Sequence, residues 1–294
     1  MPMRSGVYCP TITITDDSGR IDREKWGQHL DHLIDAGITG ILVFGSIGEF
    51  YSFSMEEKKD AVAFAAEHVA GRVPLYVGVG ATRVADVVEL ANYCEGYEVA
   101  GLFLISPYYF GPSHATAKEF FTTVANATTL PIVLYNFPAR TGTDLSPALV
   151  AELASSCPNI VGLKDTVDNI SHTRAVIEAV AKVAPEFRVF SGFDEYYTVN
   201  RIAGGAGVVS GLTNVEPETF VALHKAYEAA NFAGVVGAAS RISHLMALYG
   251  TTDLFISAIK GAVKAAGLEI ATQINAPATQ LNEEQERTIT RIIG

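Results

Sequence analysis

Short apolar runs alternate with amphipathic segments along most of the chain. Eight of these runs are rich in β-branched residues and stay apolar at consecutive positions, as parallel strands do when both faces of a sheet are covered. The runs predict strands at Val7–Ile14, Gly40–Phe44, Leu75–Val79, Gly101–Ile105, Ile132–Tyr135, Ile160–Lys164, Arg188–Ser191 and Gly207–Gly211.

The segments between these runs have the 3.6-residue period of helices. In one of them, Ser54 and Glu57 have the spacing of a capping box, in which both side chains satisfy first-turn amides. The predicted helices are Asp22–Ala36, Ser54–Ala70, Val84–Tyr97, His114–Thr128, Ser146–Ser156, Asp168–Val183, Asp194–Ala203 and Glu216–Ala230.

Successive strands begin about thirty residues apart in the middle of the chain, which is the size of one βα unit. Eight such units predict an α/β fold of the (β/α)8 TIM-barrel type, with functional residues on the loops after the strands. An open, doubly wound sheet usually has a glycine-rich nucleotide loop after its first strand, and Thr15–Gly19 lacks that pattern.

Residues 231–294 do not continue the βα alternation. They contain three further helical patterns, Phe232–Tyr249, Asp253–Ala266 and Asn282–Ile293. We therefore expect a catalytic barrel over residues 1–230 and a C-terminal helical region over residues 231–294 that packs on it.

The composition narrows the class of protein. The 294 residues are 49% hydrophobic and have a formal net charge of −11, which disfavours binding to nucleic acid or to an anionic membrane. Cys9, Cys94 and Cys157 form no CxxC pair and are expected as reduced thiols. The sequence has neither a signal-peptide pattern nor an apolar run of membrane-spanning length, so we expect a soluble, cytoplasmic protein.

The strand Ile160–Lys164 ends in a lysine, whereas the other lysines lie in polar or helix-periodic segments and are expected to be solvated. A buried ammonium group without a partner tends to lose its proton, and the neutral amine can form a Schiff base with a carbonyl. On this strand alone, an ion pair of Lys164 with Asp165 that reaches solvent is an alternative. The lysines expected to be solvated are Lys25, Lys58, Lys59, Lys118, Lys182, Lys225, Lys260 and Lys264.

The ends of two other predicted strands carry groups that could act beside this lysine. In Gly45–Glu49, two glycines flank Ser46 and Ile47, so backbone amides could turn toward a carboxylate or phosphate, although an ordinary tight turn is the alternative. Tyr135 ends the strand before Lys164. Because neighbouring strands are about 4.8 Å apart, its phenol could approach the amine and relay a proton, or it could simply fill the barrel.

Further candidates follow the fourth and seventh strands. The paired tyrosines Tyr108 and Tyr109 indicate a site, an interface or packing beneath a loop. Asp194 and Glu195 place carboxylates near the barrel mouth, where they could also start a helix. All seven histidines lie in helical patterns or at their ends rather than at strand ends, so we expect no catalytic metal.

Four short motifs occur in order along the chain: Gly45-Ser46-Ile47-Gly48-Glu49, Tyr135-Asn136-Phe137-Pro138, Gly162-Leu163-Lys164-Asp165 and Gly192-Phe193-Asp194. Taken together, they resemble the motifs of one enzyme family. The chain is similar to the pyruvate-dependent class I aldolases typified by dihydrodipicolinate synthase and N-acetylneuraminate lyase. The resemblance implies a TIM barrel with a C-terminal helical region, assembled as a homotetramer (a dimer of dimers), that acts without a cofactor. Its substrates would be pyruvate with a small aldehyde, or a keto-deoxy sugar acid.

The resemblance also implies roles for individual residues. Lys164 would form the Schiff base, and Tyr135 would relay protons. Ser46 and the amide of Ile47 would hold the pyruvate carboxylate. Tyr109 looks like the tyrosine that synthases lend to a neighbouring subunit, and Arg140 resembles the arginine that grips the carboxylate of the aldehyde. The remaining residues expected at the substrate are Gly45, Gly192, Asp194, Glu195 and Ser210.

Departures from the family pattern leave the substrate open. The synthase normally has two threonines where this chain has Ser46-Ile47, and Asp194-Glu195 resembles the acidic pair of sugar-handling members. The runs Gly45–Phe50 and Tyr135–Val150 are most similar to the 2-keto-3-deoxygluconate aldolase-like branch, in which Arg140 is often replaced by an uncharged residue.

These features predict a pyruvate-dependent lyase, either a 2-keto-3-deoxy sugar acid aldolase or a synthase-like enzyme. A Schiff-base dehydratase of a keto-deoxy sugar acid, an N-acetylneuraminate lyase and a non-catalytic barrel that binds a keto acid are the alternatives.

Overall fold

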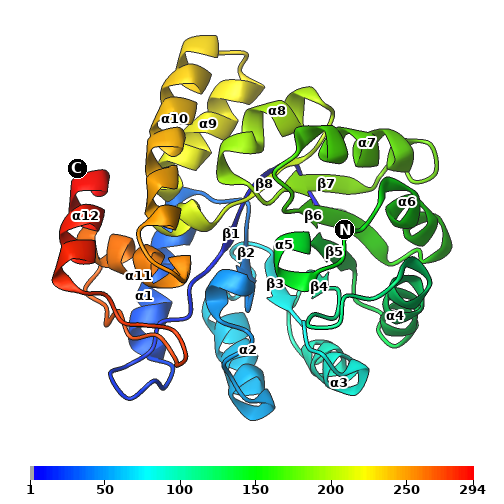
Figure 1. Cartoon of the computed structure of the whole chain (residues 1–294), viewed down its shortest axis with the longest axis horizontal. Helices are drawn as coiled ribbons and strands as arrows, with labels where there is room; N and C mark the ends of the chain where they lie inside the picture. The colour runs from blue at the N-terminus through cyan, green and yellow to red at the C-terminus, as the bar shows by residue number, and fades with distance from the viewer. Residues whose placement is uncertain (1–2) are drawn as a thin grey trace.

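A computed structural model describes residues 3–294 of the chain. In this range eight parallel strands form a closed barrel in sequence order, and β8 pairs with β1 (Figure 1). The predicted TIM barrel is confirmed, and the open doubly wound sheet is not formed. The strands are β1 (Gly6–Pro10), β2 (Gly40–Val43), β3 (Leu75–Gly78), β4 (Gly101–Ile105), β5 (Ile132–Asn136), β6 (Ile160–Asp165), β7 (Arg188–Ser191) and β8 (Gly207–Val209).

Helices surround the barrel and extend it at the C-terminal end of the chain, and α10, α11 and α12 gather on one side (Figure 1). The short α5 lies in a stretch for which no helix was predicted. The helices are α1 (Arg23–Ala36), α2 (Met55–Val69), α3 (Val84–Cys94), α4 (His114–Asn126), α5 (Pro138–Thr141), α6 (Pro147–Ser156), α7 (Ile170–Ala181), α8 (Tyr197–Ile202), α9 (Pro217–Glu228), α10 (Phe232–Leu245), α11 (Phe255–Ala265) and α12 (Glu283–Ile293). Single 3₁₀ turns are η1 (Ser46–Gly48), η2 (Asp194–Tyr196), η3 (Gly211–Asn214) and η4 (Met246–Gly250).

The first predicted strand was too long, because β1 ends at Pro10 rather than at Ile14. The residues that follow remain buried, but side chains and turns take over their polar groups. The amide of Ile12 donates to Asn214 Oδ1 at 2.9 Å, and the hydroxyl of Thr13 donates to the carbonyl of Gly48 at 2.8 Å. The apolar, β-branched run therefore predicted correctly that Val7–Ile14 is buried, but it did not predict where the strand ends.

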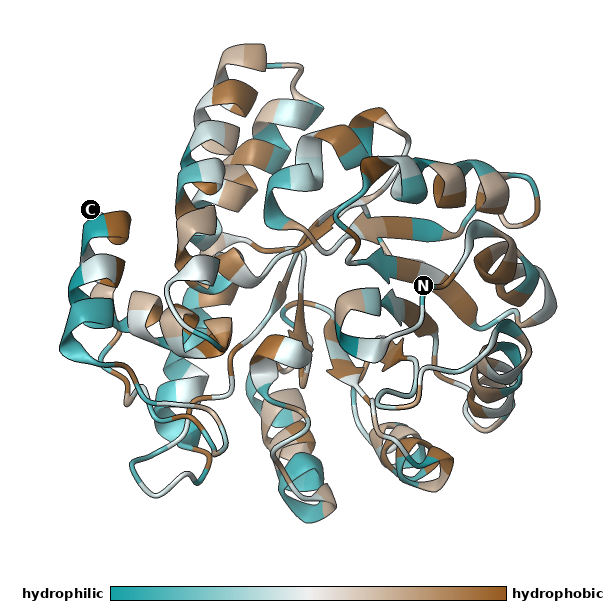
Figure 2. Ribbon diagram, in the orientation of Figure 1, coloured by the Kyte–Doolittle hydropathy of each residue, from teal (hydrophilic) through white to brown (hydrophobic). Residues whose placement is uncertain are grey.

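The strands separate two apolar cores, as alternating side chains require. One core lies between the barrel and its helices, and hydrophobic positions concentrate along the central strands (Figure 2). The other fills the barrel and contains four aromatic rings, packed edge to face with centroids 5.1–5.8 Å apart. These rings are Tyr8, Tyr76, Phe103 and Phe190. They are not part of the cavity described below, which lies at the carboxyl ends of the strands.

Two lysines that we expected to be solvated are buried. Lys260 is 0% exposed in α11, and its Nζ lies 2.6 Å from Oε1 of Glu49, which is 1% exposed. Lys58 in α2 is also buried, with its Nζ 5.9 Å from the ring centroid of Phe50. Helical periodicity could not show this, because the cover over α11 comes from segments distant in sequence.

The C-terminal segment follows the predicted helical pattern. Helices α9 and α10 pack closely on each other, and α11 packs on α12. The division of the chain at residue 230 stays a prediction. Within residues 3–294, no helix is both long enough and apolar enough to cross a lipid bilayer.

Candidate active site

A cavity of about 220 Å³ opens at the carboxyl ends of the barrel strands. Its walls are mostly apolar, and a few polar groups point into it, as is common for small-molecule sites. The lining residues are Pro10, Ser46, Ile47, Tyr135, Phe137, Lys164, Thr166, Gly192, Phe193, Asp194, Val209, Gly211, Met246, Tyr249 and Phe255.

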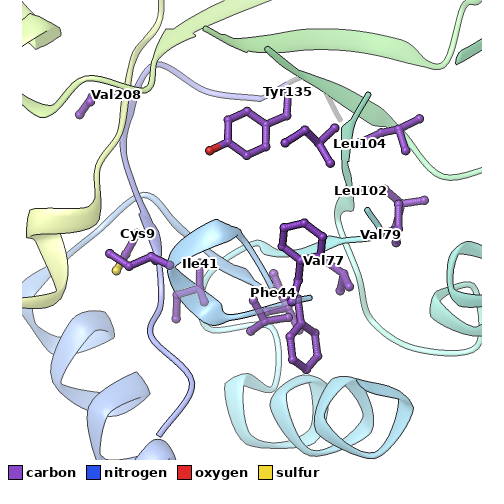
Figure 3. Packing of buried hydrophobic residues seen from close by; sticks show 14 of the residues in the cluster. Cys9, Ile41, Phe44, Val77, Val79, Leu102, Leu104, Tyr135 and Val208 are labelled. Carbon is purple, nitrogen blue, oxygen red and sulfur yellow. The ribbon is translucent and has the colours of Figure 1, made fainter. Parts of the chain in front are cut away.

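Lys164 and Tyr135 lie side by side in this cavity. They are register partners on β6 and β5, so both side chains project to the inside of the barrel. The Lys164 Nζ is 4.3 Å from the centroid of the Tyr135 ring, and each residue is 5% exposed. Figure 3 shows the Tyr135 ring and its hydroxyl projecting into the barrel. The expected approach of the phenol to the amine is therefore present in the structure.

Asp165 does not pair with Lys164. As the next residue along β6, it points to the opposite face of the strand, where its carboxylate accepts hydrogen bonds from Asn136 Nδ2, His172 Nδ1 and Thr173 Oγ1 at 2.7–3.0 Å. The hydrogen bond to Asp165 raises the pKa of His172, and burial opposes this effect. Among the ion pairs of residues 3–294, none includes Lys164. The alternative of a solvated Lys164–Asp165 pair is wrong.

The Ser46–Ile47 turn lies across the cavity from this pair of strands. It forms η1, and the Ser46 Oγ is 3.2 Å from the Tyr135 hydroxyl oxygen. The next residue after this turn, Glu49, has a left-handed backbone with φ of 56° and is tied to Lys260 in the C-terminal region. Gly45 sits just outside the lining, where an added Cβ would lie 3.3 Å from Pro10. The turn thus places the Ser46 hydroxyl next to the Tyr135 phenol, and the ion pair between Glu49 and Lys260 connects the turn to the C-terminal region.

Gly192 allows β7 to approach the lysine closely. A Cβ at this position would overlap the Thr166 hydroxyl and lie 3.1 Å from Lys164 Cε. The Thr166 Oγ1 is itself buried and has no hydrogen-bond partner among the described residues. A buried hydroxyl without a partner is costly, so its place on the cavity wall indicates a polar group on a ligand. Thr166 was not predicted from the sequence, although its position two residues after Lys164 marks the same strand face.

Asp194 is buried at the cavity wall and is held by three donors. Its carboxylate accepts hydrogen bonds from the Ser210 hydroxyl, from the Leu212 amide at 2.9 Å and from the Tyr249 hydroxyl at 2.9 Å. Burial raises the pKa of Asp194, and the three donors oppose this effect. Ser210 is fully buried behind Asp194 and does not line the cavity.

Arg140 does not reach this cavity but lines an adjoining one. The second cavity has a volume of about 370 Å³ and shares Ser46, Phe137 and Phe255 with the first. Tyr51 and Arg140 are on its wall, and Arg140 is exposed. Arg140 therefore lies on the wall of the cavity that adjoins the one lined by Lys164.

Two expected residues lie away from both cavities within this single chain. Tyr109 is 85% exposed beside Phe110, which is 84% exposed, and Glu195 is exposed. The structure thus gathers six of the predicted residues around one cavity, namely Lys164, Tyr135, Ser46, Ile47, Gly192 and Asp194. Gly45 and Ser210 lie outside its lining, Arg140 lines the adjoining cavity, and Tyr109 and Glu195 line neither.

Some cavity residues come from distant parts of the chain and were not predicted from the sequence. Met246, Tyr249 and Phe255 belong to the C-terminal helical region and carry no local signal of a site. Phe137 follows Tyr135 by two positions, and its ring stacks on that of Tyr135 with centroids 5.9 Å apart.

Among residues 3–294, no three His, Cys, Asp or Glu side chains are grouped as metal ligands would be.

The closed eight-stranded barrel and the cavity at the carboxyl ends of its strands are those of a TIM-barrel protein. Residues 3–294 match the dihydrodipicolinate synthetase family, and the chain belongs to this family. The predictions of the family and of a class I carbon–carbon lyase are confirmed. Proteins similar to this chain are described as candidate sugar acid aldolases and as 4-hydroxy-tetrahydrodipicolinate synthases.

Three relatives illustrate both branches. YagE of Escherichia coli K12, described as a candidate 2-dehydro-3-deoxy-D-gluconate aldolase, is 35% identical over 98% of this chain and 96% of its own. YjhH of the same organism, described as a candidate 2-dehydro-3-deoxy-D-pentonate aldolase, is 32% identical over 95% and 93%. A 4-hydroxy-tetrahydrodipicolinate synthase of Methanoculleus marisnigri is 33% identical over 99% of both chains. The crystal structure of YagE in complex with pyruvate covers 98% of this chain and 97% of its own, with a TM-score of 0.96.

Proposed function

We propose that the protein is a pyruvate-dependent aldolase that cleaves or forms a 2-keto-3-deoxy sugar acid through a Schiff base on Lys164. The observation that carries this proposal is the position of the Lys164 amine. It is buried in a largely apolar cavity, has no acidic partner within residues 3–294, and lies over the ring of Tyr135. An amine in this position can reach the carbonyl carbon of a ligand in the cavity, and a lysine amine is the nucleophile that forms a Schiff base.

The proposed reaction begins when the Lys164 amine attacks the keto carbon of the substrate and water leaves. The protonated imine then withdraws electrons from the adjacent carbon, so the bond between C3 and C4 breaks as the C4 hydroxyl loses its proton. Tyr135 takes this proton as its own phenolic proton moves to Ser46, whose hydroxyl oxygen is 3.2 Å away and passes a proton on toward solvent. The aldehyde leaves, the enamine on Lys164 takes up a proton at C3, and water releases pyruvate. Synthesis is the reverse sequence.

The carboxylate of the keto acid would bind at the turn formed by Ser46 and Ile47. The Ser46 hydroxyl and the Ile47 amide can both donate hydrogen bonds there. Holding the carboxylate fixes the keto carbon relative to Lys164, and such orientation removes part of the entropic barrier. Gly45 and Gly192 act by leaving room for the turn and for the lysine.

The polar groups of the cavity favour a hydroxylated substrate. Thr166 presents a hydroxyl that has no hydrogen-bond partner in the described part of the chain, and Ile47 offers no side-chain hydroxyl in the turn. Two of the three relatives are sugar acid aldolases by description. A synthase-like enzyme is the second candidate, and Arg140 in the adjoining cavity is the observation that favours it, because a guanidinium suits an aldehyde that carries a carboxylate.

A trapping experiment tests the Schiff base. The protein is incubated with pyruvate, reduced with borohydride and digested, and the modified residue is identified by mass spectrometry. We expect one pyruvate-derived adduct, on Lys164. The variant Lys264→Met is a matched control, because it removes an exposed lysine of α11 and should leave the adduct on Lys164 unchanged. An adduct on another residue, or none on a folded protein, would overturn the mechanism.

A substrate panel tests the reaction. We expect 2-keto-3-deoxy sugar acids to yield pyruvate, detected by a coupled lactate dehydrogenase assay. In the synthetic direction, pyruvate is offered with glyceraldehyde, glycolaldehyde, N-acetylmannosamine or aspartate semialdehyde. Consumption of aspartate semialdehyde alone would favour the synthase-like candidate. Loss of water from a sugar acid without pyruvate release would identify a dehydratase instead.

We further propose that the protein is cytoplasmic and assembles as a homotetramer, a dimer of dimers. The exposed ring pair Tyr109 and Phe110 supports an interface, because adjacent large apolar side chains rarely stay in contact with water without a partner. Tyr109 would then contribute to the site of a neighbouring subunit, while Glu195 would meet the substrate only after a local change. Light scattering measures the assembly, and a monomer at micromolar concentration would contradict it.

A further inference from the structure

Tyr249 links the C-terminal helical region to the cavity around Lys164. It belongs to η4, and its side chain lines the same cavity as Lys164 and Tyr135. Its hydroxyl also marks a close packing point, since a Cβ added to Gly211 would lie 2.6 Å from this oxygen and 2.9 Å from Ile47 Cδ1. The phenol oxygen therefore packs at the part of the cavity wall formed by Gly211 and the Ile47 side chain.

The Tyr249 hydroxyl uses its only proton in a hydrogen bond to Asp194. The phenol donates to Asp194 Oδ2 at 2.9 Å, while the other carboxylate oxygen is taken by Ser210 and by the Leu212 amide. Burial and the neighbouring carboxylate raise the pKa of Tyr249 well above its ordinary value, so the phenol remains protonated. A phenol that donates its only proton still has lone pairs and can accept a hydrogen bond.

We propose that Tyr249 is a specificity-determining residue that accepts a hydrogen bond from a hydroxyl group on the aldehyde-derived part of the substrate. This inference rests on the proposed function, because it requires an aldehyde-derived part bound beside Lys164. Asp194 is then a positioning residue. It orients the phenol and does not itself grip the substrate, in contrast to our expectation from the sequence.

The same arrangement selects against negative charge at this end of the cavity. Asp194 is 3% exposed, and its neighbours at the wall are largely apolar, so little water screens it. An anionic group near Tyr249 would lose its hydration and meet a buried carboxylate, which is unfavourable on both counts. The preferred ligand at this wall is therefore an uncharged, hydroxylated aldehyde rather than one that ends in a carboxylate.

The variant Tyr249→Phe tests the inference in aldol addition to pyruvate. Glycolaldehyde and acetaldehyde differ by one hydroxyl group, and glyoxylate replaces that end with a carboxylate. For the unsubstituted protein we expect kcat/KM for glycolaldehyde to exceed that for acetaldehyde by about tenfold or more, because one net hydrogen bond is worth about that factor. We expect glyoxylate to be the poorest of the three.

In Tyr249→Phe, kcat/KM for glycolaldehyde should fall about tenfold, while that for acetaldehyde should change by less than about threefold. The matched control is Tyr196→Phe, which removes a phenol hydroxyl bonded to another aspartate, Asp168, outside the cavity. It should leave the aldehyde preference unchanged. Borohydride trapping of pyruvate should be the same in all three proteins.

The outcomes separate this inference from the function on which it rests. Equal losses for both aldehydes in Tyr249→Phe would show a structural role and overturn the inference, as would no loss for either. A ratio near one between the two aldehydes in the unsubstituted protein would overturn it without any variant. If that protein forms no pyruvate adduct, the proposed function fails and the inference with it, whereas a normal adduct with unselective variants refutes the inference alone.

Discussion

The buried ion pair between Lys260 and Glu49 gives a sharp prediction for the variant Lys260→Met. The Nζ and Oε1 atoms are 2.6 Å apart, and the residues are 0% and 1% exposed. Lys260 also donates to the carbonyl of Gln273 at 2.7 Å. Met fits a helix about as well as Lys and has a similar length, so the substitution mainly removes the charge.

The expected loss of unfolding free energy in Lys260→Met comes from Glu49, which keeps its buried charge. Removing one member of a buried pair leaves the other charge uncompensated and costs about 3–5 kcal/mol of unfolding free energy. Glu49 retains one weaker partner, the Asn275 amide at 3.3 Å, which puts the expected value near the lower end of that range. Glu49 closely follows the Ser46–Ile47 turn, so we also expect a higher KM for pyruvate.

Urea unfolding measures the change, with fluorescence and circular dichroism as independent probes. The matched control is Lys264→Met, an exposed lysine on the same helix, which should change stability by less than about 0.5 kcal/mol. The double variant Glu49→Gln, Lys260→Met removes both charges and should recover part of the loss. A cost below about 1 kcal/mol for Lys260→Met, or additive effects in the double variant, would refute the reasoning.

Three further predictions concern the cavity and the barrel. Gly192→Ala should lower kcat/KM at least tenfold and weaken borohydride trapping, because the new Cβ overlaps Thr166 and crowds Lys164; activity within threefold of the original in steady-state assays would contradict the packing. Tyr135→Phe should lower kcat by about 10²–10⁴ through loss of proton transfer, and unchanged single-turnover cleavage would show that another group moves the proton. Burial lowers the pKa of His29 to about 4, so the folded state binds fewer protons than the unfolded state between pH 6.5 and 4. Unfolding free energy should therefore fall over that window as the pH drops, by up to about 3 kcal/mol from this residue, and urea unfolding of His29→Gln should have a shallower pH dependence; an equal slope would contradict the assignment.

Local sequence was sufficient for the architecture of the barrel. Continuous apolar, β-branched runs separated by amphipathic segments demand parallel strands covered by helices, and every predicted strand overlaps an observed one. The ends of the strands were predicted less accurately than their positions along the chain, as β1 illustrates. A run such as Val7–Ile14 is apolar because it is buried, and burial does not reveal whether Asn214 or a neighbouring strand satisfies its amides.

The residues closest to the proposed chemistry were also accessible from the sequence. Lys164, Tyr135 and Ser46 follow or end strands, and the carboxyl ends of barrel strands converge on one face. A lysine at the end of an apolar strand is unusual in any sequence, and this position singled out Lys164 among the lysines of the chain. The motifs then identified the family.

Only the tertiary structure decided which distant side chains meet these residues. Lys260 lies in a helix-periodic segment in which a solvated lysine is expected, yet the fold places it against Glu49. Tyr249 reaches the cavity from a helical region whose local sequence does not indicate a site. The sequence by itself thus determined the barrel fold, the position of Lys164 at a strand end and the reaction class, because strand patterns, strand ends and short motifs are local properties. Burial, pairing and the walls that select a substrate depend on contacts between segments far apart in the chain, so they were settled only by the folded protein.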